Sequence, residues 1–322
     1  MLATWARTAA TATLVVLLLT LWRGPALPAS GAPGGQLPSA PSHGFFFTGE
    51  WPYSMYVEYE KPARPTHTVP VIMVHGSNQT GAEYWMTPDG RLGWAPYFLD
   101  KGWEVYTVDW PGQGRSPTPP DFATMPYDVL IDNLVELLQR VGPAVMITHS
   151  MSGTAGWPVA ERAGDKLAAL IAIAPGPPAN MQPESSTLAQ PEDGPQRCSG
   201  ACLWDFYAVS DLFPKEAFGE WEKSSVSTSA RMVNQRQNYQ GTGPHVSGPE
   251  ILANIPAIVV TGDMDPRHSR EADAATAHWF GKEHVWLPDR GLPGHGHQMM
   301  IEHGNLQVAD VLLDWLSRTG IE

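Results

Sequence analysis

Short apolar runs alternate with helical patterns along most of the chain, and this alternation limits the fold more than any other feature. Several of the runs are continuously apolar, which is typical of strands buried on both faces of a parallel sheet. Helices that connect such strands cover the two faces of the sheet. We therefore predict an α/β fold with a mostly parallel, eight-stranded sheet and helices on both faces. The predicted strands are 45–49, 54–60, 70–75, 103–109, 144–149, 167–174, 256–262 and 284–288.

Two stretches between or after these strands have the periodicity of amphipathic helices. Residues 126–142 open on a proline, carry leucines along one side and end at Gly142. Residues 305–320 have the same pattern and end at Gly320. Both patterns predict helices that pack an apolar face on the sheet.

Residues 177–254 break this rhythm after the sixth strand. The stretch is rich in Pro, Gly, Ser and Gln, and it also contains several aromatic residues. Because long loops in compact domains are usually lids or binding segments, we predict a cap over the carboxyl edge of the sheet. The core then comprises residues 44–176 and 255–322. The aromatic residues expected to face the substrate are Trp204, Phe206 and Tyr207; the alternative is that they form the packing of the cap itself.

The first 30 residues have the pattern of a secretory signal. Arg7 supplies a positive charge, residues 11–22 form an apolar core, and small residues follow. The apolar run is shorter than the roughly 20 residues that span a bilayer. We expect residues 1–30 to be a cleaved signal peptide of a secreted or periplasmic protein; an uncleaved anchor is the alternative. Residues 31–43, rich in Gly, Pro and Ser, are expected to form a flexible lead-in.

The net charge of the protein limits the classes of molecule that it can bind. The formal net charge of −13 argues against nucleic acid or an anionic membrane surface as a partner, because both need a basic face.

The two cysteines, Cys198 and Cys202, stand close together in the predicted cap. In an oxidising compartment we expect them to form a disulfide, with free thiols as the alternative. One such pair cannot supply the four ligands that zinc prefers.

The stretch VMITHSMSGTAG (145–156) is typical of a sharp strand-to-helix turn that exposes a nucleophilic serine. Such a turn needs small residues two positions before and two positions after the nucleophile, and both Ser150 and Ser152 satisfy this loosely. The apolar strand runs through Ile147, so the turn falls at residues 149–151. This placement favours Ser150 as the nucleophile.

Candidate partners for this serine follow two later strands. Asp263 and Asp265 come after the strand predicted at 256–262, and three histidines come after the last strand. Because catalytic groups collect at the carboxyl ends of parallel strands, we expect these side chains to meet. We predict His297 as the base and Asp265 as the acid, since Asp263 should still point along its strand. The three histidines are His295, His297 and His303.

An oxyanion hole is expected beside the same turn. The strand at 70–75 ends in HGSNQTG, and the backbone amides of Ser77 and Met151 are placed to bind a developing negative charge. His295 and His297 form an H-x-H pair of a kind that binds metals, but no third ligand stands nearby, and we predict no metal site.

From about residue 44 to residue 318 the sequence resembles the α/β-hydrolase superfamily. Residues 75–116, with TPDGR, GW, YF and KG in order, and residues 294–316 are similar to the vicinal-disulfide carboxylesterases, bacterial esterases with two adjacent cysteines in the oxyanion loop. The resemblance implies an α/β-hydrolase fold, with Ser150 as nucleophile and His297, which precedes QMMIE, as base.

The sequence departs from that carboxylesterase group at two places. Ser77 and Asn78 replace the paired cysteines, so a redox role of the loop is not implied. The group takes its acid as a glutamate after the sixth strand, where this chain has Ala174. Asp265 instead stands where the wider superfamily places the acid, three residues after Gly262.

Together these patterns predict a secreted serine carboxylesterase without a cofactor, acting on a small-molecule or polymer-derived ester with an apolar or aromatic group. Two alternatives remain open: a C–C hydrolase that cleaves β-diketones with the same triad, and an inactive hydrolase fold that serves as a binding protein. No membrane contact is expected after signal cleavage, and no oligomeric state is predicted.

Overall fold

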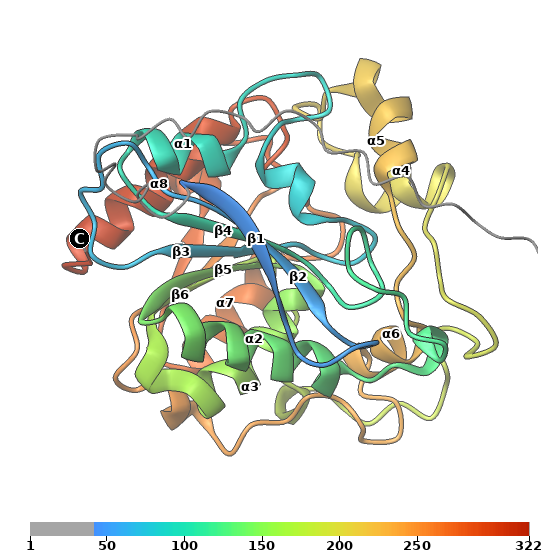
Figure 1. The fold of residues 1–322 in the computed structure, drawn as a ribbon. Coiled ribbons are helices and arrows are strands. Elements are labelled where there is room, and N and C mark those ends of the chain that lie inside the picture. The colour runs from blue at the N-terminus through green and yellow to red at the C-terminus, as the bar shows by residue number, and fades with distance from the viewer. Residues whose placement is uncertain (1–41, 322) are drawn as a thin grey trace, which may run out of the picture. The chain divides into compact units, whose positions relative to one another are not determined.

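The computed structural model describes residues 42–321, which are built around one eight-stranded sheet (Figure 1). Every strand expected from the sequence is present, within a few residues of its predicted ends. The predicted signal segment 1–30 and nearly all of the lead-in 31–43 lie outside the described residues. The strands are β1 (His43–Thr48), β2 (Met55–Glu60), β3 (Val71–Val74), β4 (Val105–Asp109), β5 (Ala144–His149), β6 (Leu167–Ile173), β7 (Ala257–Thr261) and β8 (Glu283–Trp286).

The sheet is mostly parallel, as predicted. The strand order is β1-β2-β4-β3-β5-β6-β7-β8. The pairs β1–β2 and β2–β4 are antiparallel, and every pair from β4–β3 to β7–β8 is parallel. The carboxyl ends of β3, β5, β7 and β8 therefore open toward one edge, which is where ligands bind in folds of this kind.

Helices cover both faces of the sheet (Figure 1). One face carries α1 (Trp94–Asp100) and α8 (Asn305–Arg318), and the other carries α2 (Tyr127–Val141), α3 (Met151–Ala163) and α7 (Arg270–Trp279). The helices predicted at 126–142 and 305–320 are α2 and α8. Short 3-10 helices span Gly81–Tyr84, Phe122–Thr124, Gly164–Lys166, Ala179–Met181, Lys215–Ala217, Pro249–Leu252 and Leu287–Arg290.

The alternation of side chains along the central strands divides the core into two layers. Along β3, Val71 and Met73 pack on the α1 and α8 side, whereas Ile72 and Val74 pack on the α2 and α3 side. All four are fully buried. Burial on both faces explains why these strands consist of continuous apolar runs instead of alternating polar and apolar residues.

The insertion between β6 and β7 contains three short helices, α4 (Ala201–Tyr207), α5 (Phe218–Ser224) and α6 (Ala230–Arg236). It packs on the sheet domain and does not separate as a compact unit of its own. Leu203, Phe213 and Trp221 are buried in the same apolar layer as α1 and α8. Among residues 42–321, no helix has both the length and the apolar character needed to cross a membrane.

Candidate active site

Ser150 stands at the turn between β5 and α3, at the carboxyl edge of the sheet. Its backbone angles are φ 56° and ψ −120°, and its amide donates a hydrogen bond of 2.9 Å to the carbonyl of Ile173. A Cβ atom at Gly76 would lie 3.0 Å from the Cβ of Ser150, so a glycine gives the serine room on that side. The turn has the strained form expected of a nucleophile elbow.

Ser152 has a different environment from Ser150. Its hydroxyl is fully buried, accepts a hydrogen bond of 2.8 Å from the amide of His149, and lies 2.9 Å from the carbonyls of both Val74 and His149. These contacts tie the end of β3 to the turn after β5. The hydroxyl of Ser152 therefore stabilises the turn and does not face the other candidate groups.

Three side chains that are far apart in the sequence form one hydrogen-bonded chain. Nε2 of His297 lies 3.0 Å from Oγ of Ser150, and Nδ1 of His297 lies 2.7 Å from Oδ2 of Asp265. The other carboxylate oxygen of Asp265 accepts a hydrogen bond of 2.9 Å from the amide of Arg267. The loops after β5, β7 and β8 thus bring together the residues that the sequence selected, in the geometry of a serine–histidine–acid triad.

Burial and the contact between Asp265 and His297 determine the protonation states of these two residues. Burial would raise the pKa of Asp265, but the charge and hydrogen bond of His297 outweigh it and lower that pKa to about 2. Burial lowers the pKa of His297 below its ordinary value of 6.5, against the raising effect of the Asp265 carboxylate. At neutral pH, His297 is therefore neutral and able to accept a proton, while Asp265 is ionised.

The other residues that the sequence suggested as catalytic do not take part in the hydrogen bonds that link Ser150, His297 and Asp265. Asp263 accepts a hydrogen bond of 2.7 Å from the amide of Gly294, and Nδ1 of His295 lies 2.9 Å from the buried carboxylate of Glu302. His303 is exposed. Asp263 and Glu302 therefore hold the loop that carries His297, and the two members of the H-x-H pair point to different acids.

The two amides expected to form an oxyanion hole lie at the ends of β3 and β5. Met151 is the first residue of α3, where the amides of a helix have no acceptor within the helix. For the amide of Ser77, the described part of the chain provides no recorded acceptor either. Both residues line a pocket of about 270 Å³. These two N–H groups are thus available to a bound oxygen atom.

The three aromatic residues of α4 that the sequence suggested for substrate contact do not all face the pocket. Phe206 and Tyr207 line the pocket, and the ring of Tyr207 lies 5.2 Å from that of His297. Trp204, the third aromatic residue expected to face the substrate, is not among the lining residues: its ring lies 5.0 Å from that of Phe218, and 38% of the residue is exposed. The turn of α4 directs Trp204 to α5, so it belongs to the packing of the insertion.

Two residues near the triad carried no recognisable signal in the sequence. The ring of His268 stacks on that of His297 at 5.4 Å, and its Nδ1 lies 3.0 Å from Asp273. Arg236, at the end of α6, places Nη2 3.5 Å from Nε2 of His268. Asp265, His268 and His297 are close enough to resemble a cation site. The ring nitrogens of both histidines, however, face hydrogen-bonding partners, and Nε2 of His268 faces the guanidinium of Arg236.

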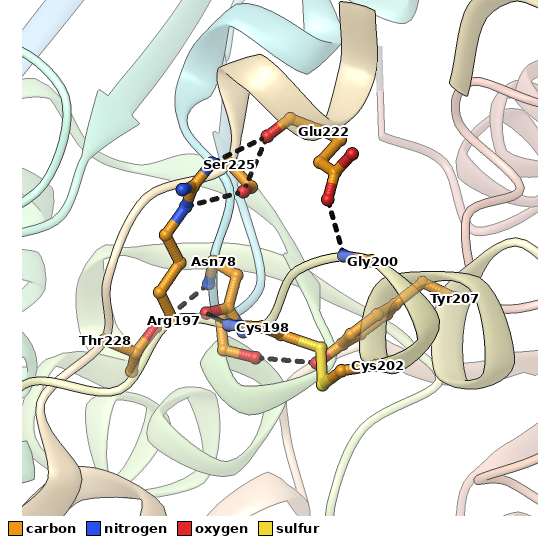
Figure 2. The surroundings of a disulfide bond; sticks show 10 residues. Asn78, Arg197, Cys198, Gly200, Cys202, Tyr207, Glu222, Ser225 and Thr228 are labelled. Carbon is orange, nitrogen blue, oxygen red and sulfur yellow. Dashed lines mark hydrogen bonds between the residues drawn. A yellow bond between two sulfur atoms is a disulfide. The ribbon is translucent and has the colours of Figure 1, made fainter. Parts of the chain in front are cut away.

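A disulfide joins Cys198 and Cys202, whose Cα atoms lie 5.4 Å apart (Figure 2). The bridged loop lies on the loop after β3, because the amide of Cys198 donates a hydrogen bond of 3.2 Å to the side chain of Asn78. Tyr207, at the end of the helix α4 that also carries Cys202, places its hydroxyl 3.2 Å from that of Ser77. The disulfide therefore borders the pocket; it joins positions 198 and 202 and not the positions 77 and 78 used by the vicinal-disulfide carboxylesterases.

Known proteins resemble this chain over most of its length. It is 25% identical over 338 residues to the probable secreted lipase phiG of Fungal sp. (strain ATCC 74256), covering 85% of this chain and 89% of that protein. A novel bacterial esterase shares its fold with a TM-score of 0.57 and 22% identity, over 88% of this chain and 99% of that one. A thermophilic esterase from Thermogutta terrifontis also shares the fold, with a TM-score of 0.60 and 19% identity, over 86% of this chain and 98% of that one.

A family model agrees with the fold. The model described as the alpha/beta hydrolase family matches residues 71–311, from β3 into α8. The matched region includes the loops after β3, β5, β7 and β8, and with them all the candidate residues described above. The resemblance to the vicinal-disulfide carboxylesterases in particular stays a prediction. On the match to the family model, the chain belongs to the alpha/beta hydrolase family.

Proposed function

We propose that this α/β hydrolase cleaves carboxylic esters through an acyl-enzyme on Ser150. The observation that carries the proposal is the hydrogen-bonded chain from Ser150 through His297 to Asp265. A serine hydroxyl is a weak nucleophile until a base accepts its proton, and the neutral imidazole of His297 lies at hydrogen-bond distance. The names of the similar proteins, a probable lipase and two esterases, point to the same bond type.

The first half of the proposed reaction forms the acyl-enzyme. Oγ of Ser150 attacks the ester carbonyl as Nε2 of His297 takes the hydroxyl proton, and the amides of Ser77 and Met151 bind the negative oxygen of the tetrahedral intermediate. When that intermediate collapses, His297 gives the proton to the leaving alcohol. The carboxylate of Asp265 stabilises the imidazolium ion in between.

The second half repeats these steps with water. His297 takes a proton from a water molecule as the water oxygen attacks the acyl group, and it returns that proton to Oγ of Ser150 as the acid leaves. The ionised Asp265 holds the ring of His297 in the same orientation throughout. No cofactor is needed for either half.

We propose that residues 177–254 act as the cap of this site. Phe206 and Tyr207 offer apolar surface to the pocket, which supports an ester with an apolar stretch next to its carbonyl. The signal pattern of residues 1–30, the Cys198–Cys202 disulfide and the name of the probable secreted lipase support export from the cytoplasm.

The test is hydrolysis of 4-nitrophenyl esters by the purified chain, with and without a serine-directed organophosphate. We expect turnover that the organophosphate abolishes, and a single adduct that peptide mapping places on Ser150. Turnover of β-diketones in preference to esters would favour C–C hydrolysis. A chain that hydrolyses no ester and forms no adduct would have the fold without the proposed activity.

A further inference from the structure

The polar side chains that line the pocket beside the proposed oxyanion amides are cations, amides and hydroxyls, and none of them is a carboxylate. Arg197, Arg236 and Arg267 line it, and none of the residues recorded as lining it is Asp or Glu. The chain as a whole has a formal net charge of −13. Three arginines in one pocket that no carboxylate lines, in so acidic a protein, point to a negatively charged ligand.

These three arginines differ from most others in the described part of the chain, which pair with carboxylates. Arg231, also on α6, lies 2.9 Å from Glu192, and Arg270 lies 2.6 Å from Asp289. No ion pair with Asp or Glu is recorded within residues 42–321 for the three pocket arginines. Arg197 uses its guanidinium to hold the insertion together, through Ser225 and the carbonyl of Glu222 (Figure 2).

Arg236 and Arg267 are the two that remain for a ligand. Nε of Arg236 is buried and has no hydrogen-bond partner within the described residues, and burial together with the charge of Arg267 lowers the pKa of Arg236. The guanidinium of Arg267 lies over the rings of Phe206 and Tyr207, at 5.2 and 5.6 Å. Two guanidinium groups thus share a pocket whose lining contains no carboxylate, and the nearby Asp273, which contacts His268, opposes only part of the lowering of the pKa of Arg236.

We infer that this pocket binds a carboxylate carried by the ester substrate, with Arg236 and Arg267 as the residues that determine this specificity. The inference deepens the proposed function and rests on it. A guanidinium binds a carboxylate through two parallel hydrogen bonds, and an anion here would compensate both cations. Because Ser77 and Met151 line the same pocket, an ester with its carbonyl at their amides can extend past Phe206 and Tyr207 toward the arginines.

The test compares esters that differ only in whether the distant carboxyl group is free or methylated. For the acyl side, the pair is 4-nitrophenyl hydrogen adipate and 4-nitrophenyl methyl adipate. For the alcohol side, the pair is the hexanoate ester of 4-hydroxybutanoate and the methyl ester of that compound. We expect kcat/KM to favour the free carboxylate by about tenfold or more in one of the pairs, as hydrogen bonds to charged groups do.

The variants Arg236→Gln and Arg267→Gln should each reduce that preference by about tenfold, mainly through KM for the anionic ester. Arg231→Gln is the matched control, because it removes the same charge from the same helix α6 outside the pocket. Its preference should stay within about twofold of that of the unaltered chain, on the scale of distant surface charges.

A second measurement does not depend on turnover. In Ser150→Ala, calorimetric titration should show monomethyl adipate binding more tightly than dimethyl adipate, and Arg236→Gln should abolish the difference. Equal treatment of the free and methylated esters by a chain that hydrolyses both would overturn the inference while leaving the ester hydrolase intact. Absence of all turnover, with the binding difference preserved, would instead overturn the proposed function and keep the carboxylate site.

Discussion

At the scale of single residues, Ser150 has a backbone conformation that only its surroundings can enforce. A residue with a side chain at φ 56° and ψ −120° carries a cost of about 1–3 kcal/mol. The hydrogen bond to the carbonyl of Ile173 and the three contacts of the Ser152 hydroxyl oppose relaxation of the turn. Two serines that stand two positions apart thus have different roles: Ser150 contacts His297, whereas Ser152 holds the turn in place.

The first prediction separates these tasks. Ser150→Ala should lower kcat by about 10⁴–10⁶, the loss typical of triad deletions, while the unfolding transition stays cooperative. Ser152→Ala should retain most of the activity but lose about 1–3 kcal/mol of stability, because the amide of His149 is left without its acceptor. Ester turnover and denaturant unfolding measure the two effects. An organophosphate adduct on Ser152 would contradict the assignment of the nucleophile.

The second prediction concerns the acid. Asp265→Asn keeps the shape of the side chain but removes the charge that stabilises protonated His297, so kcat should fall by up to about 10⁴. Asp263→Asn is the matched control, since Asp263 contacts the amide of Gly294 and not the imidazole. Asp263→Asn should lower kcat by less than about tenfold, because it perturbs only the loop that carries His297. Full activity in Asp265→Asn would remove this residue from the triad.

At the scale of secondary structure, the sequence predicts the strands well and the insertion poorly. Burial on both faces leaves a strong signal in β3, β5, β6 and β7, and the residues after such strands meet at one edge by topology alone. This is why Ser150, His297 and Asp265 could be selected before their contacts were known. The amides of Ser77 and Met151 followed from the same rule.

The side chains that reach the site from irregular or short elements carried no such signal. Trp204 and Tyr207 lie on the same short helix, and only the packing of α4 on α5 decides which of them faces His297. Arg236 comes from the end of α6 and meets His268 across 32 residues of sequence. Contacts of this kind depend on how the insertion packs on the sheet, which no local periodicity encodes.

The third prediction concerns the disulfide between the start of α4 and the loop before it. Free-thiol titration of the unfolded, unreduced protein should detect no thiol at Cys198 or Cys202. The double variant Cys198→Ser/Cys202→Ser should lose only about 2 kcal/mol of stability or less, because the closed loop is short. Its KM for esters should rise, since the amide of Cys198 holds Asn78 beside Ser77, the residue that we propose for the oxyanion hole. Two reactive thiols, or an unchanged KM in the variant, would contradict this account.

At the scale of the whole molecule, buried ionisable groups make stability depend on pH in opposite directions. Burial lowers the pKa of His75 to about 4, so the unfolded chain binds that proton first as the pH falls below 6.5, and stability declines toward acid. Burial raises the pKa of Glu83 to about 8, so the folded chain retains a proton that the unfolded chain has released. The stability due to protonated Glu83 is complete below about pH 4.5 and is lost as the pH rises through 8.

The fourth prediction isolates the alkaline side of this balance. Both carboxylate oxygens of Glu83 are buried, with no hydrogen-bond partner among the described residues. Glu83→Gln keeps the size of the side chain and removes the charge, so its free energy of unfolding, relative to that of the unaltered protein, should increase with pH. The slope should be on the order of 1.4 kcal/mol per pH unit between about pH 4.5 and 8. Denaturant unfolding at several pH values measures this slope, with the exposed Glu250→Gln as the matched control, which should show none. A constant difference between Glu83→Gln and the unaltered protein across that range would mean that Glu83 ionises at its ordinary pKa in the folded chain.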